Sequence, residues 1–431
     1  MKSPNFHSKF QKQSDRPAPS DSQENMREKP IMIGGRPAYT GRYFMIMPQM
    51  GGGYDMEMPE KVLTREFGMK IAQIDGNSPA PDQSRDISNA DAWVYPDLGV
   101  ALVGAESEEV TQKLQALSTT AGYEMEAERI VYLPDTLNVP SNTQAVPKQV
   151  LPQTDSWNIT QVNVPNSSFT GKGVKVAILD TGFNASHGDF SGRSVFPISC
   201  VPGQSAADLQ GHGSHCVGVA SGNRNPNKMR YGIAYDADIY SIKVLNDAGR
   251  GAQAWILNGM TQAVQQGCKV MSMSLGSASL PGQSYSAAYE RAAQYAMMNN
   301  CLVVAAAGND SRRSKNIFAP VGSPADSPSV IAVGAVDNRG SIADFSARGI
   351  NLPYGAIDLV APGVDIFSCW LNSGHNTISG TSMATPHVAG ILALLWEEFP
   401  SYTAGQIRKE LFKRIKAGGN NQDYGMGFCM V

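Results

Sequence analysis

The segment that most constrains this chain is a turn of small residues leading into a long apolar stretch. Residues 376 to 387 read NTISGTSMATPH, and an apolar run with helical periodicity follows from Val388 to Phe399. Gly380 permits a tight backbone turn, so Ser382 is expected at or near a helix N-terminus. Unpaired N–H groups and the positive end of the helix dipole lie there. Such a serine can attack a carbonyl, although serine at this position more often only caps the helix.

Two further segments place a carboxylate and an imidazole at comparable positions. Val174 to Leu179 is a nearly continuous apolar run, typical of a strand buried on both faces, and Asp180 follows it directly. The carboxyl ends of parallel strands are where open α/β folds build their sites. His212 lies between glycines at the start of a stretch of small residues. A single strand-end Asp or lone His is more often structural, but the ordered set of Asp180, His212 and Ser382 indicates catalysis.

These segments resemble the signatures of the subtilisin-like serine proteases, and the resemblance covers residues 153 to 431. The stretches beginning at Asp180, His212 and Gly380 match the three catalytic signatures, with Ser214 in place of the usual threonine. Residues 305 to 309, AAAGN, resemble a fourth signature that ends in Asn309. The resemblance implies an α/β fold with a mostly parallel central sheet and helices on both faces.

The residues themselves support a serine-protease mechanism. A serine hydroxyl needs an adjacent base, and the pKa of histidine lies close to neutrality. We therefore expect His212 to take the proton of Ser382 while Asp180 orients the imidazole. The resemblance assigns Asn309 to the oxyanion hole, together with the backbone N–H of Ser382. His215 and His387 are expected inside the helices that follow the catalytic residues and His187 in a loop, so all three are expected to have structural roles.

The resemblance further implies a cleft that binds peptides as an added strand. Two segments match those that flank a substrate in this family: Gly249, Arg250 and Gly251, and Ser274, Leu275 and Gly276. Gly322 is expected at the floor of a roomy S1 pocket for large apolar residues, with Asp310 at the rim, where it could also admit a basic residue. Arg250 either favours acidic residues near P2 or P4 of the substrate or is simply solvated.

The chain divides into four parts. Residues 1–41 are expected to be a disordered extension. Residues 42–135 alternate strand–helix–strand–strand–helix–strand, the ferredoxin-like α+β order, and resemble a pro-domain that acts as chaperone and inhibitor; an unrelated binding module is the alternative. Residues 136–152 form a proline-containing linker. We expect self-processing between Leu133 and Trp157, with Lys148–Gln149 a better site than Leu151–Pro152.

A structural calcium site is a further implication of the resemblance. Its candidate ligands are oxygen-bearing side chains: Gln153, Asp189, Asn223, Asn225 and Asn227. Positive charges on the same loop, at Arg224, Lys228 and Arg230, argue against this site.

Composition limits the remaining functional classes. The net charge of −3 leaves no basic footprint for nucleic acid, and no apolar stretch reaches the ~20 residues that span a bilayer. The N-terminus lacks an apolar signal-peptide core, so we expect a cytoplasmic protein with reduced thiols at its six cysteines. Cys216, four residues after His212, is expected beneath the catalytic residues.

The predicted activity is therefore serine endopeptidase, with its own pro-domain and peptides or proteins as partners. Two alternatives stay open at this point. An enzyme with the same acyl intermediate could ligate or cyclise peptides, which product masses would reveal. A catalytically silent peptide-binding protein could keep the pro-domain permanently in the cleft, and a fluorophosphonate probe would distinguish it.

Overall fold

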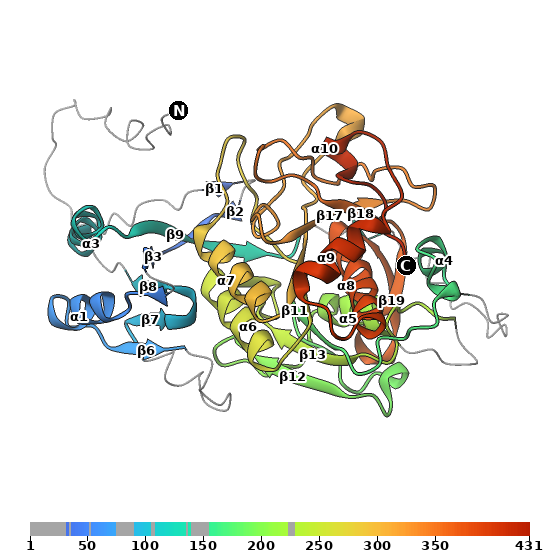
Figure 1. Ribbon diagram of the computed structural model, residues 1–431, viewed down its shortest axis with the longest axis horizontal. Helices are drawn as coiled ribbons and strands as arrows, with labels where there is room; N and C mark the ends of the chain where they lie inside the picture. The colour runs from blue at the N-terminus through green and yellow to red at the C-terminus, as the bar shows by residue number, and fades with distance from the viewer. Residues whose placement is uncertain are drawn as a thin grey trace, which may run out of the picture.

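A computed structural model of the chain describes residues 32–33, 36–50, 53–74, 90–104, 108–134, 137–138, 155–222 and 229–431 (Figure 1). The larger part, from residue 155 onward, is built on a seven-stranded sheet in the order β12-β13-β11-β15-β16-β17-β18. Every neighbouring pair in it is parallel, which confirms the predicted α/β core. Its strands are β11 (Lys175–Asp180), β12 (Val195–Ser199), β13 (Asp238–Lys243), β15 (Val270–Met273), β16 (Leu302–Ala306), β17 (Ile331–Val336) and β18 (Leu359–Pro362).

Helices cover both faces of this sheet, because alternate side chains of each strand point to opposite sides. In β11, Val176 and Ile178 pack into the core that includes α5 (His212–Ser221) and α8 (Thr381–Glu398). Ala177 and Leu179 pack into the opposite core, with α6 (Gln253–Gln265) and α7 (Ala287–Met298). This two-sided burial explains why the strand reads as an uninterrupted apolar run. The chain then adds α9 (Ala404–Lys413), which packs on α8.

The N-terminal unit is a sheet with two helices. In Figure 1 it lies to one side of the part from residue 155 onward, which is expected to be catalytic and is called the catalytic unit below. It comprises β3 (Tyr39–Ile46), α1 (Glu57–Arg65), β6 (Ile71–Gln73), β7 (Ala92–Tyr95), β8 (Val100–Gly104), α3 (Glu108–Ala121) and β9 (Glu124–Tyr132). The order differs from the predicted one by the additional strand β7. β3 pairs antiparallel with both β8 and β9, and β7 lies between β8 and β6 in the sheet.

The boundaries of this unit also differ from those expected. β3 begins at Tyr39, three residues before the predicted start at 42, and the short strands β1 (Met32–Ile33) and β2 (Arg36–Pro37) pair ahead of it. The rest of the predicted disordered extension lies outside the described residues. So does most of the linker 136–152, of which only Leu137 and Asn138 are described, as β10.

The two units are joined by shared β-structure. The N-terminal sheet has the order β14-β9-β3-β8-β7-β6, and β14 (Arg250–Ala252) belongs to the catalytic unit. β10 pairs antiparallel with β20 (His375–Ser379), which also pairs with β19 (Ile366–Cys369). The chain therefore contacts the catalytic unit on either side of residues 135 and 136. The remaining elements are short: β4 (Gln49–Met50), β5 (Gly53–Tyr54), α4 (Trp157–Gln161) and α10 (Asn421–Tyr424).

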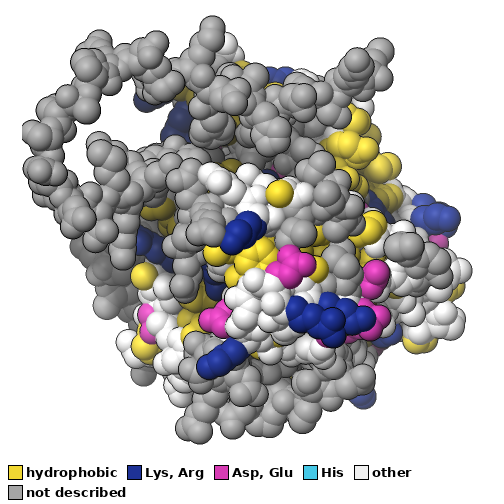
Figure 2. Space-filling view, turned by 90° about the vertical axis from the view of Figure 1, so that its left-hand side faces the viewer, with side chains coloured by type: hydrophobic (Ala, Val, Ile, Leu, Met, Phe, Trp, Pro, Cys, Tyr) yellow, Lys and Arg dark blue, Asp and Glu magenta, His cyan; other side chains and the backbone are white. Residues whose placement is uncertain are grey.

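The surface and the thiols add little that is specific. On the face at the N-terminal end, basic and acidic side chains of the described residues lie next to one another (Figure 2). None of the helices in the described part of the chain combines the length and apolarity that crossing a bilayer requires. All six cysteines are described, and each is a free thiol.

Candidate active site

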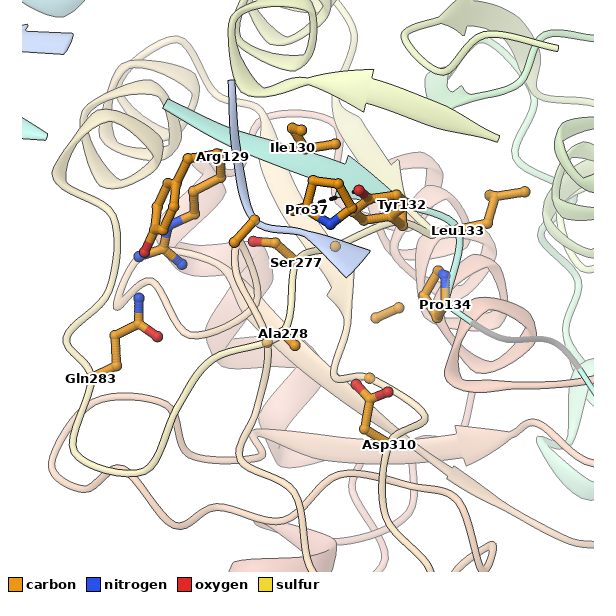
Figure 3. A pocket seen from close by; sticks show the side chains of 16 residues that line it. Pro37, Arg129, Ile130, Tyr132, Leu133, Pro134, Ser277, Ala278, Gln283 and Asp310 are labelled. Atoms are coloured by element: carbon orange, nitrogen blue, oxygen red, sulfur yellow. Dashed lines mark hydrogen bonds between the residues drawn. The ribbon is translucent and has the colours of Figure 1, made fainter. Parts of the chain in front are cut away.

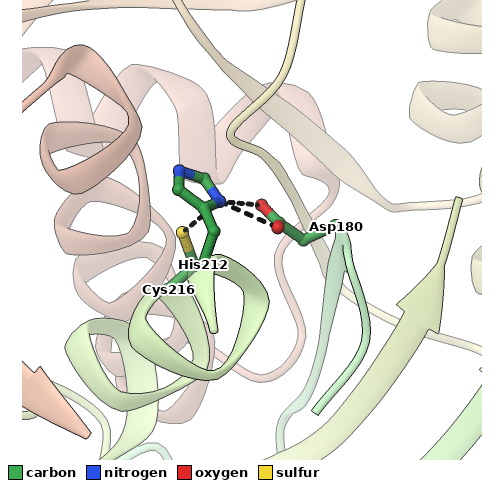
Figure 4. Close-up of side chains that lie close together, drawn as sticks. All are labelled: Asp180, His212 and Cys216. Atoms are coloured by element: carbon green, nitrogen blue, oxygen red, sulfur yellow. Dashed lines mark hydrogen bonds and ion pairs between the residues drawn. The ribbon is translucent and has the colours of Figure 1, made fainter. Parts of the chain in front are cut away.

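Asp180 and His212 meet at the edge of the parallel sheet. Asp180 ends β11, His212 begins α5, and His212 Nδ1 lies 2.8 Å from Oδ1 and 3.0 Å from Oδ2 of Asp180 (Figure 4). Burial lowers the pKa of His212, but Asp180 and Cys216 both raise it, and together they bring the pKa well above its usual value. Because Nδ1 donates to Asp180, Nε2 is the ring atom that can act as a base.

Ser382 lies in the first turn of α8, where the sequence predicts it. It is fully buried, and its Oγ donates to the Ser274 carbonyl at 3.4 Å. Within the described ranges, Nε2 of His212 has no hydrogen-bond partner. A Ser382–His212 hydrogen bond therefore requires a new side-chain conformation of Ser382, of the kind that often forms only with substrate bound.

Gly380 precedes this helix for a reason other than the tight turn predicted. Its φ of 166° is extended backbone that any residue can adopt. A Cβ at this position would instead lie 3.0 Å from Nδ2 of Asn309. The glycine thus provides room for the asparagine amide beside the serine.

Asn309 is held in one orientation by its carbonyl oxygen. Oδ1 accepts from the Thr381 backbone N–H at 2.9 Å and from the Thr381 hydroxyl at 2.8 Å. Two donors on one atom identify it as the oxygen, so the amide N–H groups point the other way. The side chain is 3% exposed and lies next to the serine turn, which suits a fixed donor for an oxyanion.

Asp208 is a functional residue that the sequence analysis missed. Its carboxylate, 4% exposed, accepts five hydrogen bonds and so ties the loop before His212 to the residue after Asp180. The donors are the Thr181 hydroxyl, the backbone N–H groups of Gln210 and Gly211, and the backbone N–H and hydroxyl of Ser214. A lone aspartate in a polar loop carries no sequence signal for this role.

The other buried histidines have structural partners. His215 Nε2 lies 3.0 Å from the Ile366 carbonyl, and His387 Nδ1 lies 2.7 Å from the Met383 carbonyl. Burial lowers the pKa of His215 to about 3 and that of His387 to about 4, so both are neutral at physiological pH. His187 caps a short 3₁₀ turn and contacts the Gly374 carbonyl.

Cys216 lies beneath the triad, as expected. Its Sγ is 3.8 Å from Nδ1 of His212 and 3.6 Å from the Ser382 carbonyl (Figure 4). Burial raises the pKa of this thiol. A protonated, buried thiol is a poor nucleophile, so Cys216 packs under the site and leaves the chemistry to Ser382.

The two segments expected to flank a substrate enclose the end of β9. Arg250 to Ala252 pair antiparallel with residues 130 to 132 on one side. On the other side, Tyr132 N donates to the Gly276 carbonyl at 2.9 Å, and Gly276 N donates to the Tyr132 carbonyl at 3.0 Å. Leu133 N donates to the Gly249 carbonyl at 3.0 Å. The N-terminal unit therefore supplies an extended strand between both segments.

Arg250 is exposed and lies opposite Tyr132, with its guanidinium 6.0 Å from the tyrosine ring. Its preference for acidic residues near P2 or P4, or its simple solvation, stays a prediction.

Pro134 lines a cavity of about 110 Å³ together with Gly276, Asp310 and Gly322 (Figure 3). The last two are the residues for which an S1 role is predicted. A Cβ on Gly322 would lie 2.8 Å from the Ser277 carbonyl oxygen, so glycine is needed there.

The calcium prediction rests on one described residue. Asp189 is buried, and its Oδ2 accepts from the Tyr231 hydroxyl at 2.9 Å and contacts His375 Nε2 at 2.8 Å. His187 also lies in this cluster, and two imidazoles with one carboxylate are not the oxygen set that calcium prefers. Gln153, Asn223, Asn225 and Asn227 lie outside the described residues.

Comparisons with known proteins agree with this geometry. Residues 171–428 match the subtilase family. The chain is 36% identical over 285 residues to Subtilisin E of Bacillus subtilis (strain 168), which is 65% of this chain and 71% of that protein. It is 39% identical over 270 residues to Subtilisin DY of Bacillus licheniformis, or 62% of this chain and 93% of that protein. M-protease of Shouchella clausii is 37% identical over 302 residues, covering 69% and 72%.

Proposed function

The chain belongs to the subtilase family and is a serine endopeptidase, and we propose that it is made as a self-inhibited precursor that cuts its own chain. The observation that carries the proposal is the position of β9 between the two substrate-flanking segments. A strand held between both of these segments occupies the path that a peptide substrate would take. A second peptide cannot bind there at the same time, so the N-terminal unit acts as an inhibitor.

The chemistry follows from the side chains at the sheet edge. His212 Nε2 takes the Ser382 proton as Oγ bonds to the substrate carbonyl carbon, and Asp180 stabilises the resulting imidazolium. Asn309 Nδ2 and the Ser382 backbone N–H bind the oxyanion. His212 then gives the proton to the departing amine, and water hydrolyses the acyl-enzyme by the same steps in reverse.

The register also bears on where the chain is cut. Because Tyr132 pairs with Gly276, Pro134 falls opposite Ser274 in the antiparallel ladder. Proline has no N–H to donate there, so the ladder ends before the bond that follows Pro134. We therefore propose that the cut lies between Leu133 and Trp157. The chain after β9 must first slide along the two flanking segments, so that another bond reaches Ser382.

Substrate choice at S1 is part of the same proposal. The cavity that Pro134 lines is roomy because Gly322 has no side chain, which favours large apolar residues before the cut bond. Asp310, exposed at the rim, gives a second attraction for a basic residue.

A stabilising calcium ion is a further part of the proposal. Asp189 would be one ligand, with Gln153 and the asparagines at 223, 225 and 227 supplying the oxygen atoms that the described cluster lacks.

Ser382→Ala tests self-processing directly. The full-length variant, purified without other proteases, should keep its N-terminus, whereas the wild type should be shortened to a start between residues 134 and 157. A fluorophosphonate should label the processed wild type at Ser382. Ser373→Ala, at an exposed loop serine, is the matched control and should process normally. A shortened Ser382→Ala chain, or a full-length wild type that cleaves peptides, would contradict the proposal.

A further inference from the structure

We propose that the catalytic unit has an acidic subsite built on Asp326, which binds a basic side chain five residues before the S1 residue of a substrate. This rests on the proposed function, because it takes β9 as the path of a substrate. In the full-length chain the subsite is filled by Arg129.

The position follows from the register of β9. Pro134 lies in the S1 cavity, and the hydrogen bonds of Leu133 and Tyr132 fix the strand on both sides. Pairing continues back to Ile130, opposite Ala252. Counting Pro134 as the first position, Arg129 is the sixth. Its backbone N–H donates to Oε1 of Gln253 at 3.1 Å, so the catalytic unit still holds the strand at this point.

Arg129 is buried against the catalytic unit. It is 6% exposed, which is unusual for an arginine, and it lines the same cavity as Ser277 and Gln283. Figure 3 shows Arg129 and Gln283 at one end of this cavity, away from Pro134. Its Nη1 has no hydrogen-bond partner among the described residues.

Asp326 is a buried carboxylate next to the floor of this cavity. Its backbone N–H donates to the carbonyl of Gly322, a cavity residue, and its Oδ2 accepts from the Ser279 hydroxyl at 2.9 Å. It is 3% exposed, and Oδ1 has no partner in the part of the chain that the structure describes. Burial raises the pKa of Asp326, and the charge of Arg129 acts in the opposite direction.

The two charges attract each other without a direct ion pair. Burial raises the pKa of Tyr289 well above its usual value, and the charge of Arg129 opposes this rise, so that charge acts on the interior behind the cavity. When β9 leaves, Asp326 loses this cation. A substrate with arginine or lysine at the same position puts a cation back beside Asp326. The attraction between two charges is stronger in a partly buried site of low dielectric than between exposed charges.

The test compares peptides cut by the processed enzyme. Two fluorogenic peptides share one sequence from the fifth position to the cut bond and carry either arginine or glutamine at the sixth. We expect the wild type to prefer arginine by about tenfold in kcat/KM, mainly through KM. Asp326→Asn should cut both alike. Asp310→Asn is the matched control, because it removes a carboxylate near S1 and should retain the preference.

The outcomes separate this inference from the proposed function. If no peptide is cut, the endopeptidase assignment fails. If peptides are cut and the wild type does not distinguish arginine from glutamine, or Asp326→Asn retains the preference, the subsite is wrong.

If the Asp326→Asn chain folds poorly, a second measurement tests the subsite without that variant. In the newly made chain, before it cuts itself, Arg129→Gln should speed fluorophosphonate labelling of Ser382 several-fold, because β9 is held less firmly. A labelling rate within a factor of two of wild type would also overturn the subsite.

Discussion

At the scale of single residues, the catalytic base is governed by two opposing influences. Burial lowers the pKa of His212 and Asp180 raises it, with a net rise well above the usual value. The base must be neutral to accept a proton, so activity is lost as pH falls through this raised pKa. We therefore expect the acid limb of kcat/KM above pH ~6.5, the ordinary histidine value.

Asp180→Asn tests this assignment. Removing the carboxylate charge leaves burial as the main influence, so the acid limb should move to lower pH while kcat falls by roughly 10⁴-fold. The pH profiles of the two enzymes on one peptide check both effects. Asp236→Asn, at an exposed site, should leave the profile unchanged. An acid limb that stays in place would mean that Asp180 does not set the pKa of His212.

Asp208 offers a second prediction at this scale, for a positioning residue. Asp208→Ala removes the acceptor of five hydrogen bonds and frees the loop that carries His212. Misplacing a catalytic group by ~1 Å can cost about 100-fold in rate, so we expect a loss of this order in kcat with KM within twofold. Steady-state kinetics at several pH values distinguish this from unfolding, which would lower the active fraction without changing the pH profile.

At the scale of elements, the N-terminal unit is held by two helix ends. Glu128 Oε1 accepts from the Ala254 N–H at 3.0 Å, in the first turn of α6, and Glu126 Oε2 accepts from the Ala288 N–H at 3.2 Å, in the first turn of α7. Both carboxylates lie at the positive end of a helix dipole. The fully buried Glu128 also pairs with Arg42, with Oε2 of Glu128 2.7 Å from Nε of Arg42.

Neutralising these carboxylates should loosen the inhibitor. We expect Glu128→Gln to speed fluorophosphonate labelling of the full-length chain by about tenfold, and Glu126→Gln by less, since a partly exposed dipole contact is worth ~0.3–1 kcal/mol. Glu124→Gln, at an exposed site on the same strand, is the control. Equal labelling rates in all three variants would show that the helix ends do not hold β9.

The elements also show how far sequence patterns reach. The apolar run of β11 and the glycine before His212 were predictable, because each constraint is local: Gly211 has a φ of +103°, which favours glycine. β7 was missed although Trp93 to Tyr95 favour a strand. Asp208 and Asp326 were not predictable, since their partners come from distant segments that only the fold brings together.

At the scale of the whole molecule, the calcium proposal predicts a change in the melting temperature of the protein. Any ligand that binds only the folded state raises the melting temperature, and the rise grows with the logarithm of the ligand concentration above its Kd. If calcium binds at Asp189, the processed enzyme should melt several degrees higher in millimolar calcium than in chelator, and Asp189→Asn should abolish the difference. Identical melting temperatures in calcium and chelator would contradict a calcium site at Asp189.

β14 is part of the N-terminal sheet in the full-length chain, and its pairing with β9 limits which proteins the processed enzyme can attack. Once β9 departs, β14 and Gly276 present backbone groups that only an extended chain can satisfy. A helix or a strand already paired in a folded target has no such groups free. The enzyme therefore acts on segments that have first come loose, and its rate on a native protein follows how often the target opens there.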